Sequence, residues 1–98
     1  MCGIVGVHGH PEAANLAYLG LHALQHRGQE AAGIASSDGK SLFVQRRLGL
    51  VSEAFSRRGD MEMLRGSAAI GHVRYATAGD GAIRNAQPLS VDYAHGSL

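Results

Sequence analysis

Cys2 is the residue whose type and position most directly suggest covalent chemistry. It follows Met1 and is the only cysteine among 98 residues. If Met1 is removed, the thiol and the free α-amine belong to one residue, and an amine with a pKa of about 7.7–8.0 can accept the thiol proton near neutral pH. The sequence therefore predicts a nucleophile that carries its own base. The alternative, a small buried side chain, is the commoner role of a lone intracellular cysteine.

A second chemical candidate follows an expected strand over residues 67–75. Arg74 stands at the end of this strand, and Thr77 lies in the small-residue loop that comes after it. A guanidinium can bind a carboxylate through two parallel hydrogen bonds, and a hydroxyl adds a further donor. These two residues predict a carboxylate site, although an ordinary surface arginine at a strand end would show the same pattern.

Two other patterns resemble ligand sites but fit them poorly. Residues 33–41 (GIASSDGKS) resemble a phosphate-binding loop, yet five residues separate the glycines and no helix is expected to follow. His22 and His26 have the i, i+4 spacing of half a zinc site, without the further ligands that zinc requires. We expect a hairpin in the first case and no metal in the second.

The elements that must position Cys2 and Arg74 follow from apolar runs and turn residues. Gly3–His8 is predicted to be a strand buried on both faces, because its apolar residues do not alternate cleanly with polar ones. An apolar helix is expected from Pro11 to about Gln25. Asp38-Gly39 predicts a hairpin between two strands. The other expected elements are strands over 31–36, 41–46, 67–75 and 88–93, short helices over 53–57 and 61–65 capped by Ser52 and Asp60, and a loop over 76–87. This pattern predicts an α+β fold.

Composition excludes several classes of protein. The chain has nine basic and eight acidic residues, a formal net charge of +1 and only five aromatic residues, whereas a nucleic-acid-binding domain usually has a clustered basic face. No run approaches the ~20 apolar residues of a membrane span. One cysteine forms no internal disulfide, so we expect a cytoplasmic protein with neither nucleic acid nor membrane as partner.

Three segments together resemble the class II, or N-terminal-nucleophile, glutamine amidotransferases. They are residues 1–6 (MCGIVG), 24–34 (LQHRGQEAAGI) and 71–77 (GHVRYAT). The resemblance is strongest to the branch of that family that uses phosphoribosylpyrophosphate in purine synthesis. It implies an αββα sandwich of the N-terminal-nucleophile hydrolase type, of which residues 1–98 would be the N-terminal part, without the phosphoribosyltransferase domain.

The resemblance also implies roles for particular residues. Cys2 would attack the glutamine side-chain amide to give a thioester, Arg74 would bind the α-carboxylate with help from Thr77, and Arg27 and Gly28 would shape the loop beneath the nucleophile. The ammonia would convert phosphoribosylpyrophosphate to phosphoribosylamine in the full-length enzyme. No cofactor is expected within this chain. Full-length relatives would use Mg²⁺ with phosphoribosylpyrophosphate, some would hold an iron–sulfur cluster, and we expect a homo-oligomer. His72 is expected to be structural.

Alternatives to this branch remain. The amino-sugar branch, glucosamine-6-phosphate synthase, typically has Tyr in place of Gln29 and Trp in place of Tyr75, so both residues argue against it. In this family an Asn-Gly pair and a later Asp complete the glutaminase site, and neither occurs within the 98 residues. We therefore expect residues 1–98 alone to have little or no glutaminase activity. A non-catalytic interaction module is the other possibility.

Overall fold

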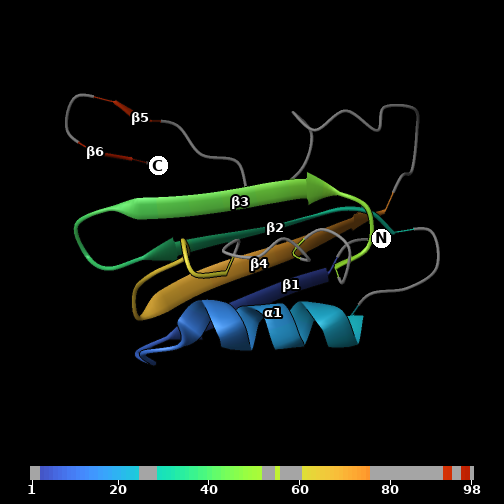
Figure 1. The fold of residues 1–98 in the computed structure, drawn as a ribbon, viewed down its shortest axis with the longest axis horizontal. Helices are drawn as coiled ribbons and strands as arrows, with labels where there is room; N and C mark the ends of the chain where they lie inside the picture. Colours follow the sequence, from blue (N-terminus) through green and yellow to red (C-terminus); the bar gives the residue numbers. More distant parts are fainter. Residues whose placement is uncertain are drawn as a thin grey trace.

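The protein is built on one antiparallel sheet with a helix across one face (Figure 1). The computed structural model describes residues 3–24, 29–51, 55, 61–75, 92–93 and 96–97. The strand order is β1-β4-β2-β3, and all three pairings are antiparallel. The elements are β1 (Gly3–His8), α1 (Ala13–Leu24), β2 (Gln29–Ser37), β3 (Leu42–Leu48), β4 (Ala68–Tyr75) and a separate hairpin of β5 (Asp92–Tyr93) with β6 (Gly96–Ser97). The α+β class is confirmed.

The strand β1 has the predicted bounds but not the predicted burial. Its residues alternate between partly buried and exposed, and Ile4 is 73% exposed. The prediction of a strand buried on both faces was wrong, because α1 covers only one face of the sheet. We call the opposite face, which carries Ile4 and Ile70, the outer face.

The helix α1 rests on the sheet through small residues. It begins at Ala13, slightly after the predicted start at Pro11, and its buried positions are Ala13, Ala14, Ala17 and Leu21. A Cβ added to Gly20 would come within 2.9 Å of both methyl groups of Val5. The helix therefore lies close to β1. On the side of α1 that faces away from the sheet, Leu19 is 61% exposed.

The predicted hairpin between β2 and β3 is confirmed, with Ser37 paired to Leu42. Only Gly39 adopts a positive φ in the turn (+91°). Asp38 contributes its side chain instead, since Oδ1 accepts hydrogen bonds from the backbone N–H groups of Lys40 (2.9 Å) and Ser41 (2.7 Å). In a phosphate-binding loop these N–H groups would face an anion; here they bind the Asp38 carboxylate.

The segment between β3 and β4 differs from expectation. Residues 61–63 form a turn and residues 64–65 have no regular structure, with a backbone hydrogen bond from Leu64 N–H to Met61 O (3.1 Å), so the predicted helix over 61–65 was wrong. Of the other expected helix, over 53–57, only Phe55 is described. The expected strand over 67–75 is confirmed as β4. The loop over 76–87 lies outside the described residues, as do residues 88–91 of the last expected strand.

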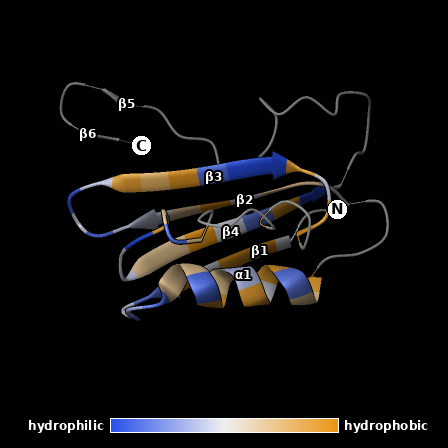
Figure 2. Ribbon diagram, viewed as in Figure 1, coloured by the Kyte–Doolittle hydropathy of each residue, from blue (hydrophilic) through white to orange (hydrophobic). Residues whose placement is uncertain are grey.

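The core lies between α1 and the inner face of the sheet. Its largest fully buried side chains include Leu21, Ile34, Val51 and Val73. Figure 2 shows β3 as hydrophobic over its first half and hydrophilic toward its end, where Gln45, Arg46 and Arg47 stand. Among the described residues, no helix has the length and apolarity needed to cross a membrane.

Candidate functional site

Three strand ends meet at one edge of the sheet. Because β4 runs antiparallel to both of its neighbours, it ends where β1 and β2 begin. Gly3 pairs with Val73, Ala31 with Arg74, and Gln29 with Tyr75. The arrowhead of β4 points to this edge in Figure 1. We call it the site edge, because every residue predicted to carry chemistry belongs to a segment that adjoins it.

A β-bulge lies at the site edge. Gln29 and Ala31 oppose the consecutive residues Tyr75 and Arg74, so Glu30 is one extra residue in β2. Bulges of this kind bend the strand and re-aim side chains, and they are over-represented beside active sites. Nothing in the local sequence signals this bulge, so it was not predicted.

Arg74 is the predicted site residue that the structure describes. It is the second-last residue of β4, half-buried and on the outer face. The other predicted site residues lie outside the described part of the chain. They are Cys2, Arg27, Gly28 and Thr77. The structure thus brings together the strand ends that adjoin them, without placing the four residues themselves.

His72 lies on the outer face two residues before Arg74. It pairs with Ile4 of β1 on one side and Gly33 of β2 on the other. Although Ile4 is largely exposed, His72 is only 7% exposed, and its buried Nδ1 has no hydrogen-bond partner among the described residues. Burial lowers the pKa of His72, and the positive charge of Arg74 lowers it further. This imidazole is therefore held toward its neutral form.

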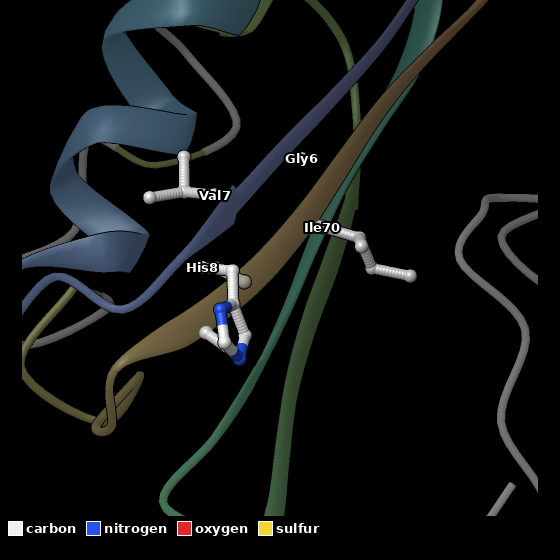
Figure 3. Close-up of a pocket in the computed structure, with 6 residues that line it drawn as sticks. Gly6, Val7, His8 and Ile70 are labelled. Atoms are coloured by element: carbon white, nitrogen blue, oxygen red, sulfur yellow. The ribbon is translucent and has the colours of Figure 1, made fainter.

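A shallow hollow of about 330 Å³ opens at the opposite end of the same face (Figure 3). It is lined by Gly6, Val7, His8, Ala68, Ala69 and Ile70. Figure 3 shows Val7 directed toward the helix, away from His8 and Ile70. The hollow is mostly apolar and lies apart from Arg74, so it does not coincide with the predicted site.

The described side chains do not form a metal site. In that part of the chain, no three His, Cys, Asp or Glu residues come close enough together to hold a metal ion. His26, one half of the pair considered above, lies outside the described residues. Cys2 is the only cysteine of the chain, so the chain's own residues do not fit a cysteine-held iron–sulfur cluster.

Comparisons with known proteins agree with the predicted resemblance. No model of a protein family matches the chain. It is 52% identical over 97 residues to an amidophosphoribosyltransferase from Rhizobium etli, a match that covers 99% of this chain and 20% of the relative. The chain thus spans about a fifth of the length of the curated relatives it matches.

Two solved structures are also similar. One, described as the allosteric regulatory enzyme of purine biosynthesis, has a TM-score of 0.86 and 47% identity, covering 95% of this chain and 20% of that one. The other is glutamine phosphoribosylpyrophosphate amidotransferase from B. subtilis, with a TM-score of 0.84 and 44% identity, covering 96% and 19%. These similarities confirm the resemblance identified from the sequence.

Proposed function

Because the chain is similar over nearly its whole length to part of the amidophosphoribosyltransferases, we propose that it is the N-terminal part of a glutaminase domain in such an enzyme. Its proposed role is to release ammonia from glutamine by way of a thioester on Cys2. The ammonia would then convert phosphoribosylpyrophosphate to phosphoribosylamine, the first committed step of purine synthesis, on a second domain.

The meeting of strand ends at the site edge is the observation that carries the proposal. Cys2 is bonded to Gly3, and Arg74 is bonded to Val73, the residue that pairs with Gly3. Consecutive Cα atoms are about 3.8 Å apart and paired ones about 4.5–5.5 Å. Covalent connectivity therefore keeps the Cα atoms of Cys2 and Arg74 within about 13 Å, a span that a glutamine and two side chains can bridge.

In the proposed chemistry, Arg74 binds one end of the glutamine molecule and Cys2 attacks the other end. The Arg74 guanidinium binds the α-carboxylate, with the Thr77 hydroxyl as a second donor. The Cys2 thiol gives its proton to the α-amine, and the thiolate attacks the side-chain amide carbon. The α-ammonium group passes this proton to the amide nitrogen, so the tetrahedral intermediate expels ammonia and leaves a thioester, which water hydrolyses to glutamate and the free thiol. Arg27 and Gly28 are proposed to shape the loop beneath the nucleophile, a role that rests on the resemblance to class II glutamine amidotransferases alone.

The exposed apolar residues of the outer face support the finer fold assignment. Ile70 is 53% exposed there, beside the still more exposed Ile4. A second sheet packed on this face would bury both, as in an αββα sandwich. We propose that arrangement for the domain that contains residues 1–98.

The remaining assignments rest on similarity alone. We propose a homo-oligomeric cytoplasmic enzyme that binds Mg²⁺ together with phosphoribosylpyrophosphate on its second domain. The described residues of this chain offer no ligand set for that ion, so no step here depends on it. Neither nucleic acid nor membrane is proposed as a partner.

Mass spectrometry tests the nucleophile. The protein made in its own host should lack Met1, and a diazoketone analogue of glutamine should add once, to Cys2. Excess L-glutamine should slow the labelling, and Cys2→Ser should abolish it. An intact Met1, or labelling that glutamine does not slow, would contradict the proposal.

A further inference from the structure

The Asp38-Gly39 pair in the β2–β3 turn carries a reactive pair of groups that the proposed mechanism does not use. The backbone nitrogen of a glycine that follows an aspartate can attack the side-chain carboxyl carbon, because glycine has no side chain to hinder the approach. The new C–N bond closes a five-membered succinimide, and the carboxyl OH leaves with the amide proton as water. Water then opens the ring at one of its two carbonyls, which gives aspartate or isoaspartate. The reaction therefore needs no oxidant or other reactant.

The closed turn holds both reacting groups in hydrogen bonds. The nucleophile, the Gly39 N–H, donates to Ser37 Oγ at 3.1 Å. On the electrophile, Asp38 Oδ1 accepts from the backbone N–H groups of Lys40 at 2.9 Å and Ser41 at 2.7 Å. Ring closure requires the Asp38 carboxyl carbon to eclipse its own backbone carbonyl carbon, which lies away from the staggered rotamers. The two hydrogen bonds at Oδ1 oppose this rotation, and the bond to Ser37 opposes loss of the amide proton.

Further contacts stabilise the closed form of the turn. The Asp38 N–H donates to the backbone oxygen of Ser41 at 3.4 Å. Gly66 packs against the other side of the turn, so closely that a Cβ added there would overlap the backbone oxygen of Ser37. The hydrogen bonds from the N–H groups of Ser41 and Lys40 also lower the pKa of Asp38. Because a carboxylate is a poorer electrophile than a carboxylic acid, this effect slows ring closure as well.

We propose that Asp38-Gly39 is a modification site, whose backbone isomerises to isoaspartate in chains in which the turn is open, and that the closed turn suppresses this reaction. Both residues are exposed to solvent, so burial does not protect them and the hydrogen bonds decide the rate. In isoaspartate the main chain runs through the former side-chain carboxyl carbon. The carboxylate then leaves the position in which it accepts from Lys40 and Ser41, so an isomerised chain loses these two hydrogen bonds of the hairpin.

Peptide mapping of the full chain tests the proposal. The chain is kept in buffer or in guanidinium chloride at the same pH and temperature and is then digested with trypsin. Isoaspartate in the peptide of residues 28–40 is measured by chromatography and mass spectrometry. It should form at least about tenfold more slowly in buffer, since one hydrogen bond is commonly worth a factor of about five and three must break. The second Asp-Gly pair of the sequence, Asp80-Gly81, is the internal reference, and in guanidinium chloride both pairs should convert at similar rates.

Two serine variants test the hydrogen bond of the nucleophile. Ser37→Ala removes the acceptor of the Gly39 N–H and should speed isomerisation in buffer by about fivefold. Ser41→Ala is the matched control, because its backbone N–H still donates to Asp38, and it should leave the rate unchanged. Equal rates for the native chain in buffer and in guanidinium chloride, or equal rates for the two variants in buffer, overturn the proposal. Neither result bears on the proposed function, which the labelling of Cys2 tests separately.

Discussion

Leu21 of α1 lies directly over Gly71 of β4. A Cβ added to Gly71 would stand 2.8 Å from Cδ1 and 3.0 Å from Cγ of Leu21, whose side chain is fully buried. Because both the tip and the branch point of Leu21 are involved, the side chain cannot move away without disturbing the core. The absence of a side chain at position 71 therefore sets how closely the helix approaches the central strand.

Gly71→Ala should destabilise the fold. Overpacking a filled core typically costs about 1–3 kcal/mol, and the urea midpoint should fall accordingly. Gly6→Ala is the matched control, since an added Cβ there meets no atom within 4 Å. It should leave the midpoint unchanged or slightly raised. Equal losses in the two variants would show that α1 does not rest on Gly71.

Two leucines of the same helix should respond very differently to truncation. Leu21→Ala leaves a cavity beneath the helix and should lower the unfolding free energy by about 2–5 kcal/mol. Leu19→Ala removes a largely exposed side chain and should change it by less than about 0.5 kcal/mol. Urea unfolding followed by circular dichroism compares them. A large loss in Leu19→Ala would mean that another surface covers this side of α1.

The turn at Asp38 should give the hairpin an acid-dependent stability. Backbone hydrogen bonds from Ser41 and Lys40 lower the pKa of Asp38 below the ordinary value of an aspartate, 3.8. A lowered pKa stabilises the folded state above the unfolded-state pKa, and this contribution is lost as the pH falls through the folded-state value. The urea midpoint of the native chain should therefore drop more steeply below about pH 4 than that of Asp38→Asn, which keeps an acceptor oxygen but does not ionise. If the urea midpoints of the native chain and of Asp38→Asn fall equally as the pH decreases, the prediction is contradicted.

Arg74→Lys should impair glutamine recognition while it keeps the positive charge. Lysine cannot form the paired hydrogen bonds of a guanidinium, and charge-assisted hydrogen bonds are worth about 1.5–3 kcal/mol. The glutamine concentration that half-protects Cys2 from the diazoketone should rise about 10-fold to 100-fold. The matched control is Arg65→Lys, at an exposed position before the start of β4. It should leave the half-protecting glutamine concentration unchanged. A similar rise in both variants would remove Arg74 from the binding site.

Local sequence was sufficient to predict the elements whose signals are local. The bounds of β1, the hairpin at Asp38-Gly39 and the strand that contains Arg74 were all predicted, because apolar runs and turn residues act over a few positions. The turn at residues 61–65 was mistaken for a helix. The described backbone hydrogen bond, from Leu64 N–H to Met61 O, spans three residues as in a turn, and an N-cap residue before a short apolar segment does not ensure a helix.

Long-range features could not be read from the same signals. The exposure of Ile4 depends on which face α1 covers, and the burial of His72 depends on neighbours from strands far away along the chain. The bulge at Glu30 arises from the register between β2 and β4. For the candidate site, the sequence predicted which residues take part. The structure added that the strands next to these residues, β1, β2 and β4, meet at one edge of the sheet.

The strand order β1-β4-β2-β3 has a consequence for the newly made chain. His8 pairs with Ala68 and Gly3 with Val73, so β1 leaves the ribosome long before the strand that will hold it. At 5–20 residues per second, the wait is about 3–14 s. During that time the hairpin of β2 and β3 can close, while β1 presents unpaired backbone groups to other nascent chains. The arrival of β4 closes the sheet from its centre, and a ribosome that stalls before residue 68 would hold two separate pieces of an unfinished fold.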